Sequence, residues 1–493
     1  MKKLFFTLCV ALTAVLALNA QTYSGNIVLV RNGQTYNQDV TVTVAQQANG
    51  LNTLTLQVPL FGTMVMNDVT ASETGGITVY SAERDVNTNF GAMRTTLFAR
   101  TVDGMMAANV AIPAQNTTMW FNTVGDHFQL PNSDFEAWNA NNGEPERWHG
   151  FKSAGGSFAS ISSGLVSLEQ SNDLHSGTTG SHSAVMTAGG IFATIANGTM
   201  TNGRLMAGSM SATSYDNHAE MDKSNGTDDF YMPLYAKPDK FNVWLKYTQG
   251  TSNANNKASV SVKTFDGTYY QEPSDSTTEW TNLSGSIVGG QIAASDWTHY
   301  SFPFDYDSYA ANQAASEAIF VTFSTNGNPG QGSKGDALYV DDMELVYLGN
   351  MTDLRYQGAT INGWNPDVTA YSMETNGEPN LDDFTATIEG VSAVLTKSME
   401  QNADGSYRIA ISVVSADLQN AACYIITATA PAATLKGDVD NDGEIGIGDV
   451  TALIDYLLKG TDDINEQAAD LDDSNDITIS DVTSLIDLLL KGN

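Results

Sequence analysis

Residues 437–445 read Gly-Asp-Val-Asp-Asn-Asp-Gly-Glu-Ile, and residues 469–477 read Ala-Asp-Leu-Asp-Asp-Ser-Asn-Asp-Ile. The chain therefore carries an internal duplication. In both copies, side chains with oxygen donors stand at positions 1, 3, 5 and 12 of a loop of about twelve residues. These are Asp438, Asp440, Asp442 and Asp449 in the first copy, and Asp470, Asp472, Ser474 and Asp481 in the second. Position 6 is Gly443 or Asn475, residue types that tolerate a positive φ. The pattern predicts two sites for one kind of cation.

Calcium explains the spacing of these donors. A hard cation that takes about 6–8 oxygen ligands needs a loop that folds alternate side chains inward and adds a backbone carbonyl at position 7, here Glu444 or Asp476. After each loop, apolar residues recur with the period of a helix, and each helical stretch ends at a Lys-Gly pair, at residues 459–460 and 491–492. A solvated acidic tail would have no reason to repeat both features. Calcium is therefore the predicted cofactor.

A loop followed by one helix, duplicated and without a helix before the first loop, resembles the type I dockerin domain over residues 435–493. The resemblance implies a small α-helical module that folds around calcium and binds a cohesin-like module on a scaffold or surface protein. In dockerins, the residues that read the partner stand at loop positions 10 and 11. These positions hold Ile447 and Gly448 in the first loop, and Ile479 and Ser480 in the second. They differ from the hydroxyl pair of the best-known dockerins, which indicates a more apolar contact.

The length and composition of the chain limit the class of protein to which it can belong. Its 493 residues are expected to form roughly three or four domains. A hydrophobic fraction of 42% with 16% charged residues and 43 Gly predicts β-rich modules and not disorder. Acidic side chains number 56 against 22 basic ones, and the net charge of -34 repels phosphates and anionic lipids. We therefore expect no nucleic-acid partner.

The first 20 residues predict secretion. Lys2 and Lys3 precede a mainly apolar run over residues 4–18, and the small residue Ala20 stands before Gln21, which is the layout of a secretory signal peptide. We expect residues 1–20 to be removed and the protein to be secreted or extracellular, including association with the cell surface. No other stretch holds about 18 consecutive apolar residues, so no membrane insertion is expected.

Residues 21–113 alternate apolar and polar side chains in short runs, as half-buried strands do. Such runs include residues 40–44, 54–58 and 77–80. Asn-Gly pairs at residues 32–33 and 49–50 predict the turns of an antiparallel meander. The strand series resembles the calycin-like β-barrel module of secreted gut-bacterial proteins. Such a barrel holds either a small apolar ligand or a packed interior, and the short length favours the packed interior.

Residues 126–348 form the largest predicted module. It opens with Leu-Pro-Asn-Ser-Asp-Phe-Glu-Ala-Trp at residues 130–138 and closes on an apolar strand at residues 337–345. These ends resemble those of carbohydrate-binding jelly rolls and of a gut-bacterial module named for a role in carbohydrate metabolism. The resemblance places Glu136 beside Asp342 as candidate ligands of a structural calcium. The alternative is that Glu136 caps a turn and Asp342 is a solvated strand residue.

The same module holds five of the seven Trp residues of the chain, which are the candidate substrate-binding residues. They are Trp138, Trp148, Trp244, Trp280 and Trp297. Aromatic rings bind the apolar faces of sugars, while amide and carboxylate groups meet the hydroxyls, so a polysaccharide is the predicted partner. Any single Trp is nevertheless more often a core residue than a sugar platform.

Residues 350–431 read as a further series of strands and resemble the small immunoglobulin-like or cadherin-like β-sandwiches that act as spacers. Residues 431–434 are the expected linker to the dockerin. The predicted fold class is thus a mostly β multidomain protein, with a calycin-like barrel, a jelly-roll β-sandwich and a small β-sandwich, and a small α-helical calcium-binding dockerin at the C-terminus.

No nucleophile, zinc or phosphate-binding motif occurs in the chain. Glycoside hydrolysis needs only two suitably spaced carboxylates, and the central module offers many. The candidates are Glu136, Glu144, Glu146, Glu220, Asp228, Asp229, Glu272 and Glu279, and no pair among them is favoured. The preferred interpretation is a non-catalytic, secreted glycan-binding protein attached to a cohesin-bearing scaffold or surface partner. The alternatives are a glycoside hydrolase and a structural cell-surface adhesin.

Overall fold

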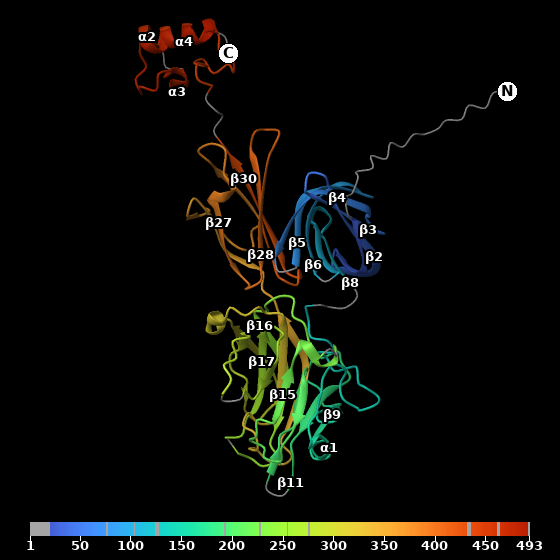
Figure 1. Ribbon diagram of the computed structural model, residues 1–493. Coiled ribbons are helices and arrows are strands. Elements are labelled where there is room, and N and C mark those ends of the chain that lie inside the picture. Colours follow the sequence, from blue (N-terminus) through green and yellow to red (C-terminus); the bar gives the residue numbers. More distant parts are fainter. Residues whose placement is uncertain are drawn as a thin grey trace, which may run out of the picture. The chain divides into compact units, whose positions relative to one another are not determined.

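The computed structural model describes residues 20–74, 77–102, 104–123, 128–191, 194–225, 228–253, 255–274, 277–430, 435–460 and 464–491. The predicted signal peptide lies outside these residues apart from Ala20, and so does the predicted linker at residues 431–434. None of the helices in this part of the chain has the length and apolarity that a membrane crossing requires. The fold is mostly β, as predicted (Figure 1).

Eight antiparallel strands close into the N-terminal barrel (Figure 1). They are β1 (Ala20–Arg31), β2 (Gln34–Gln46), β3 (Asn52–Val58), β4 (Gly62–Thr74), β5 (Ile77–Thr88), β6 (Gly91–Val102), β7 (Met105–Ile112) and β8 (Thr117–Thr123), with a 3₁₀ turn at Pro113–Gln115. The barrel closes where β8 pairs with β1, with Ile27 opposite Phe121. The predicted boundary at residue 113 was therefore one strand too early.

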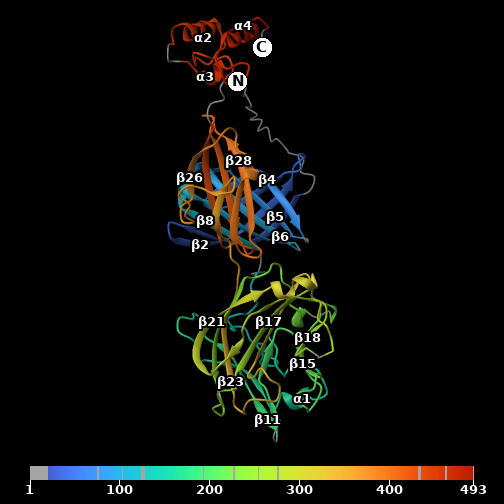
Figure 2. The same cartoon turned by 90° about the vertical axis from the view of Figure 1, so that its left-hand side faces the viewer.

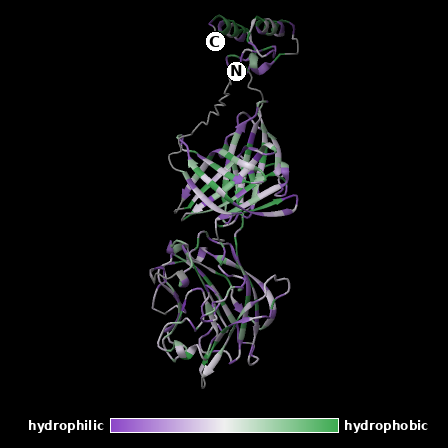
Figure 3. Ribbon diagram, turned by 90° about the vertical axis from the view of Figure 1, so that its right-hand side faces the viewer, coloured by the Kyte–Doolittle hydropathy of each residue, from purple (hydrophilic) through white to green (hydrophobic). Residues whose placement is uncertain are grey.

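Alternation of side chains along the strands fills the barrel. Val40, Val42 and Val44 of β2 are buried inside, while the residues between them lie on the outer face. The buried cluster includes side chains from every strand of the barrel, and Figure 3 shows apolar and polar residues interleaved along these strands. Asn32 and Gly33 both adopt a positive φ between β1 and β2, as the twist of a two-residue hairpin requires.

The central module is built from short antiparallel strands and one short helix (Figure 2). These are α1 (Ala159–Ser162), β9 (Ser167–Ser171), β10 (Ser183–Thr187), β11 (Gly189–Ile191), β12 (Thr194–Ala196), β13 (Thr199–Thr201), β14 (Arg204–Ala207), β15 (Asn217–Met221), β16 (Lys240–Thr248), β17 (Ala258–Phe265), β18 (Tyr270–Glu272), β19 (Leu283–Ile287), β20 (Gln291–Ile292), β21 (Ser295–Asp305), β22 (Ala318–Ser324) and β23 (Ala337–Val346). Three 3₁₀ turns lie at Lys223–Asn225, Asp228–Phe230 and Asp307–Asn312.

One long sheet and one short sheet decide where the site lies in this module. The long sheet runs in the order β13-β22-β17-β19-β21-β16-β23-β10-β9, with β20 beside β17, and the short sheet runs β14-β15-β18. Large buried side chains such as Trp148, Phe241 and Phe323 fill the core. Both cartoon views show α1 and β11 at the same end of this jelly roll (Figures 1 and 2).

The next strands form two sheets, of three and four strands. They are β24 (Asn350–Tyr356), β25 (Ala359–Thr360), β26 (Ala370–Glu374), β27 (Phe384–Glu389), β28 (Val394–Gln401), β29 (Tyr407–Val414) and β30 (Ala421–Thr429), with a 3₁₀ turn at Leu381–Asp383. The sheet orders are β25-β24-β27 and β26-β30-β29-β28, and β26 runs parallel to β30. Two small sheets agree with a β-sandwich, and the immunoglobulin-like or cadherin-like assignment stays a prediction.

The C-terminal module holds α2 (Ile447–Lys459), α3 (Glu466–Ala469) and α4 (Ile479–Lys491). The two long helices start after the two predicted loops, and their buried faces share one core that includes Val450, Leu453, Val482 and Leu485. Helix α2 ends at Gly460, whose φ of 62° is the left-handed conformation common at helix ends. The duplicated apolar spacing thus produces a pair of equivalent helices around one small core.

Candidate functional site

A cavity of about 470 Å³ lies within the jelly roll, lined by residues of α1, β12 to β15, β17, β18 and β22 and of the loops beside them. Its volume falls in the range of about 300–1,000 Å³ that small-molecule sites occupy. The long sheet supplies one wall and the short sheet supplies another. The lining residues come from sequence positions between Phe151 and Gly330, so the cavity exists only once the two sheets have formed.

The wall from the long sheet is lined with hydroxyl groups. Val260 and Val262 of β17 point into the core, so Ser259 and Ser261, which alternate with them, face the other way. Strand pairing sets Ser259 opposite Ser324 and Ser261 opposite Thr322, and Thr199 of β13 stands opposite Ser324 from the other side. All five residues line the cavity. Paired strands thus place a row of hydroxyl groups on one surface.

The wall from the short sheet combines apolar side chains with polar ones, namely one carboxyl group and Asn217 and His218 of β15. Strand pairing aligns Leu205, Ala219 and Glu272 across β14, β15 and β18, and all three line the cavity. Leu205 and Ala219 are buried. The Ser261 hydroxyl donates to Oε1 of Glu272 at 2.8 Å, a bond that joins the two sheets.

Glu272 is the only acidic residue among the described residues that line the cavity. Its Oε2 atom is buried and has no hydrogen-bond partner. Burial raises the pKa of the Glu272 carboxyl, against the opposing influence of Lys263 and the bond from Ser261. An unpaired buried oxygen costs free energy, and a ligand hydroxyl in the cavity would remove that cost.

Asn197 presents a second unpaired oxygen in the cavity wall. Its Nδ2 donates to the carbonyl oxygens of Asn326 and Asn328, at 3.1 and 3.2 Å. These two bonds fix the orientation of the amide, and they leave the buried Oδ1 without a partner. Two of the residues that line the cavity therefore each have a buried side-chain oxygen without a hydrogen-bond partner.

His218 also lines the cavity, and both of its ring nitrogens are engaged. Nδ1 lies 2.7 Å from the carbonyl oxygen of Tyr215, and Nε2 lies 3.1 Å from Oε2 of Glu220. Burial alone would lower the pKa of His218, but the bonds to Glu220 and Tyr215 together raise it. Glu220 compensates the charge of the protonated ring, so this pair adds no net charge for a ligand to meet.

None of the five predicted tryptophans is among the residues that line the cavity. Trp148 has no exposed surface and packs between Phe135 and Phe323 in the core, so its assignment to sugar stacking was wrong. The cavity was missed because its polar groups are ordinary Ser, Thr, Asn and Glu residues that no motif marks. Glu272 was one of eight candidate carboxylates, and the sequence contained no signal that singled it out.

The other four tryptophans are partly exposed and make local contacts. Trp138 donates to the carbonyl oxygen of Phe135, and Trp280 packs edge-on against Tyr270 with a ring distance of 5.0 Å. Trp244 stacks on His175 at 4.2 Å, and Trp297 donates to Asp173 at 2.9 Å. These rings are spread over different elements, and their role in sugar binding stays a prediction.

Glu136 and Asp342, the predicted ligands of a structural calcium, have different partners. Oε1 of Glu136 accepts hydrogen bonds from the backbone amides of Ser181 and His182. Oδ2 of Asp342 lies 2.7 Å from Nε2 of His175, and the neighbouring Asp341 carboxylate lies 4.0 Å from the same nitrogen. Carboxylate and imidazole atoms of His175, Asp341 and Asp342 lie within 4.8 Å of one another. Asp341, which was not predicted, therefore completes the acidic cluster.

The two C-terminal loops adopt matching conformations. The side chain of Asp449 accepts hydrogen bonds from the amides of residues 439, 440 and 446, and Asp481 repeats this pattern with residues 471, 472 and 478. Gly443 and Asn475 have φ values of 89° and 62°, as position 6 was expected to require. In each loop, carboxylate atoms at positions 1, 3 and 12 lie within 4.8 Å of one another. The donors are all oxygens, which fits a hard cation.

The predicted partner-reading residues lie at the starts of the two long helices, next to these loops. Ile447 is 83% exposed and Ile479 is 72% exposed. Gly448 and Ser480 follow them on the surface. Near the other ends of the same helices, Leu458 and Leu490 are 77% and 80% exposed. Sequence reasoning missed this second pair, although the duplication places it at equivalent positions.

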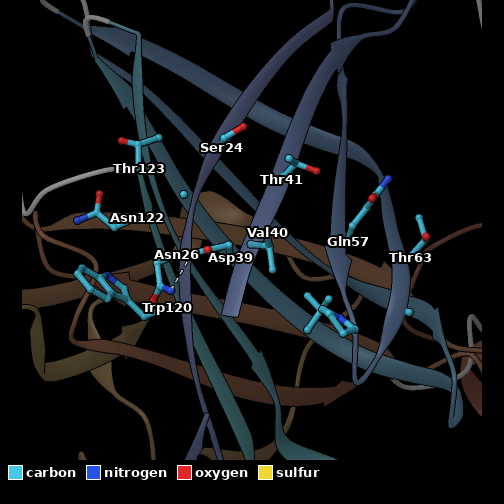
Figure 4. A pocket seen from close by; sticks show the side chains of 14 residues that line it. Ser24, Asn26, Asp39, Val40, Thr41, Gln57, Thr63, Trp120, Asn122 and Thr123 are labelled. Atoms are coloured by element: carbon cyan, nitrogen blue, oxygen red, sulfur yellow. Dashed lines mark hydrogen bonds between the residues drawn. The ribbon is translucent and has the colours of Figure 1, made fainter. Parts of the chain in front are cut away.

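A further hollow of about 1180 Å³ lies along strands β1 to β4 and β8 of the barrel (Figure 4). Figure 4 shows hydroxyl and amide side chains along it, including Ser24, Thr41 and Gln57, with Trp120 at one side. Nδ2 of Asn26 donates to Oδ1 of Asp39 at 3.3 Å, from one strand to the next. Most of these side chains belong to the outer, polar face of the strands. The hollow contains no cluster of titratable groups among the residues that line it.

Comparison with known families identifies two parts of the chain. Residues 120–346 match the family described as "Putative carbohydrate metabolism domain", and residues 436–490 match the Dockerin type I domain. The chain therefore carries a carbohydrate metabolism domain and a C-terminal type I dockerin. No curated protein matches this chain.

Solved structures give weak similarities only. A "putative glycoside hydrolase" from Bacteroides thetaiotaomicron is 14% identical, with 60% of this chain and 86% of that chain covered and a TM-score of 0.32. The C-terminal family 22 carbohydrate binding module of Clostridium thermocellum Xyn10B is 10% identical, covering 44% of this chain and 94% of that chain, with a TM-score of 0.19. The tandem family 22 modules of Paenibacillus barcinonensis Xyn10C are 9% identical, covering 66% and 74%, with a TM-score of 0.22. Scores this low carry no argument about the site.

Proposed function

We propose that this chain, with its carbohydrate metabolism domain and its type I dockerin, is a secreted glycan-binding protein that attaches to a cohesin-bearing scaffold or surface partner. The glycan site is the cavity between the two sheets of the jelly roll. The dockerin brings that site to the partner assembly.

One observation carries the assignment of the cavity. Oε2 of Glu272 and Oδ1 of Asn197 are buried in its wall without partners, beside the hydroxyl row of β17 and β22. Buried polar atoms are normally paired, so two unpaired acceptors in one cavity indicate a ligand that donates hydrogen bonds. Sugars carry many hydroxyl donors together with apolar C–H faces, and the cavity offers both kinds of wall. These groups support a sugar as the ligand of the cavity.

Binding is favoured over hydrolysis by the number of carboxylates. Glycoside hydrolysis uses two carboxyl groups about 5–10 Å apart. Glu272 is the only carboxylate among the described residues that line the cavity, and Glu220, which is not among them, is paired with His218. A second acid or base in the cavity would be required for the hydrolase alternative.

The dockerin residues fit calcium by the chemistry of their donors. Asp438, Asp440, Asp442 and Asp449, with the carbonyl of Glu444, would hold one ion; Asp470, Asp472, Ser474 and Asp481, with the carbonyl of Asp476, would hold the other. The bound ions would neutralise part of the negative charge of this module. The loops would then fix the starts of α2 and α4, where the exposed isoleucines face the cohesin.

A third calcium remains part of the proposal, with Glu136 and Asp342 as its ligands beside the cluster of His175, Asp341 and Asp342. Its support is Asp341, whose buried Oδ2 has no hydrogen-bond partner and lies 4.0 Å from Nε2 of His175. Burial and the neighbouring Asp342 raise the pKa of Asp341 to about 7, as expected for a carboxylate with too few compensating charges. Metal analysis of the full chain should count three calcium ions, and the Asp342→Asn variant should count two. A count of two calcium ions in both the parent protein and the variant would contradict this third site.

A glycan array with the full-length protein tests the main proposal. The Glu272→Ala variant should lose the retained glycans, because it removes the acceptor in the cavity wall. Glu279→Ala is the matched control, since Glu279 is exposed and does not line the cavity. An array that retains nothing, or a Glu272→Ala variant that binds as the parent does, would contradict the proposal. Release of reducing sugar from the retained glycans would instead support the hydrolase.

A further inference from the structure

The cavity has features beyond those that a hydroxyl-rich ligand requires. Its described lining contains no Lys and no Arg. The His218 ring is already paired with Glu220, and Glu272 is an acid. A ligand carboxylate or sulfate would therefore meet one acid and no Lys or Arg among the described lining residues of a partly buried site, which costs free energy. The site selects against acidic sugars.

Apolar side chains cover a larger part of the cavity than a bare hexose needs. The short sheet contributes Leu205 and Ala219, and the region of α1 contributes Phe158 and Ile161. Met210 completes this surface at the edge of the cavity. Ile161 is 48% exposed and Met210 is 56% exposed. Exposed apolar residues beside a cavity indicate a ligand with an apolar group that covers them.

The two kinds of wall face one ligand from different sides. Ser261 belongs to the hydroxyl row and donates a hydrogen bond to Glu272. Across the strands of the short sheet, Glu272 is aligned with Ala219 and Leu205. Hydroxyl groups and a methyl group must therefore lie close together on the ligand. The volume of about 470 Å³ is near the lower end for ligand sites, so it accommodates a short unit and not a long chain.

We propose that the cavity binds a neutral sugar unit that carries a methyl group, either as a 6-deoxyhexose or as an N-acetylhexosamine. This inference rests on the proposed glycan-binding function. The hydroxyl row, Asn197 and Glu272 hold the ring hydroxyls, and the wall of Leu205, Ala219 and Met210 holds the methyl group. A sugar that replaces the methyl group by a hydroxyl leaves that hydroxyl against an apolar wall.

Matched pairs of methyl glycosides test the inference on the full-length protein by isothermal titration calorimetry with calcium present. The first pair is methyl fucoside and methyl galactoside of the same enantiomeric series and anomeric configuration, which differ only in the 6-deoxy position. The second pair is the methyl glycosides of N-acetylglucosamine and glucose. Methyl glucuronide is the acidic probe. We expect the methyl-bearing member of one pair to bind about tenfold more tightly than its partner, the scale expected for one group in an apolar pocket. The pair that shows the preference identifies the source of the methyl group.

Two variants connect the preference to the apolar wall. Met210→Ser should reduce the tenfold preference to about threefold or less and leave the fold intact, because Met210 is exposed. Val288→Ser is the matched control, since Val288 is 54% exposed in the same module and does not line the cavity. The control should keep the full preference.

The outcomes separate this inference from the function on which it rests. Equal or tighter binding of the hydroxylated or acidic partners would overturn the inference and leave glycan binding standing. A preference that Met210→Ser and Val288→Ser change equally would also overturn it. If none of these methyl glycosides and no glycan on the array binds the protein, both proposals are overturned.

Discussion

The hydroxyl of Ser261 donates to Oε1 of Glu272 across the two sheets of the jelly roll, at 2.8 Å, while Oε2 of the same carboxyl stays unpaired. One oxygen thus holds the sheets together, and the other remains for a ligand. The sheets themselves create the cavity, because Ser261 belongs to β17 and Glu272 to β18. The Glu272 side chain therefore both links the two sheets and contributes to the proposed sugar site.

The pH dependence of stability provides a first test of this carboxyl. Burial raises the pKa of Glu272 above its ordinary value of 4.5. As the pH rises from that value, the unfolded chain releases the proton while the folded protein keeps it, so the free energy of unfolding falls. The Glu272→Gln variant cannot ionise. We expect its melting temperature, relative to that of the parent, to increase between pH 4.5 and pH 8.

The exposed Glu279 supplies the control for this measurement. The Glu279→Gln variant should show no pH-dependent difference from the parent protein. Trp fluorescence can follow the transition, with excess calcium at every pH. A constant difference between Glu272→Gln and the parent would show that the carboxyl has an ordinary pKa.

Two tryptophans should respond differently to substitution. Trp148 is fully buried, so Trp148→Ala should cost about 3–5 kcal/mol of stability through lost burial and the cavity left behind. Trp297 is partly exposed and donates one hydrogen bond to Asp173, so Trp297→Ala should cost about 1 kcal/mol. Chemical denaturation of both variants measures the difference. Equal losses would contradict the assignment of Trp148 to the core.

Calcium should be required for the C-terminal helices. Residues 435–493 contain 15 acidic and 3 basic side chains, so their mutual repulsion opposes folding when no cation is bound. We expect calcium titration of the full chain to lose one dockerin site in Asp438→Ala and both in Asp438→Ala with Asp470→Ala. Circular dichroism should show a loss of helix only where sites are lost. Normal calcium counts in the single variant would refute the assignment of Asp438.

The exposed isoleucines should decide cohesin binding without affecting the fold. Ile447 and Ile479 are mostly exposed, so replacing both by Arg should change stability by about 0.5 kcal/mol or less. The double variant should lose binding to a type I cohesin panel by at least about tenfold, because charges replace the apolar contact. The control is the double variant Thr451→Arg with Thr483→Arg, which adds the same two charges to the same helices but keeps the isoleucines. Loss of binding in both double variants would point to charge and not to the isoleucines.

The sequence by itself determined the features that depend on neighbours along the chain. Loop donors at fixed positions, a positive φ at Gly443 and Asn475, and the helical period that follows are all local features. The structure has the positive φ values and the two helices, and the assignment of the loop donors to calcium stays a prediction. The barrel was also predictable, because alternation along strands and Asn-Gly turns are local signals. Its eighth strand was missed because Thr117–Thr123 lies beyond the expected boundary, and barrel closure requires its pairing with β1.

Only the tertiary structure decided the candidate site. Asn197, Ser261, Glu272 and Ser324 come from separate segments of the chain and belong to no motif. They line one cavity because β17 pairs with β22 and because the short sheet meets the long one at Glu272. The burial of Trp148 depends in the same way on side chains from distant segments. Periodicity fixes which face of a strand is apolar, but strand pairing fixes which faces meet, and the cavity forms where they meet.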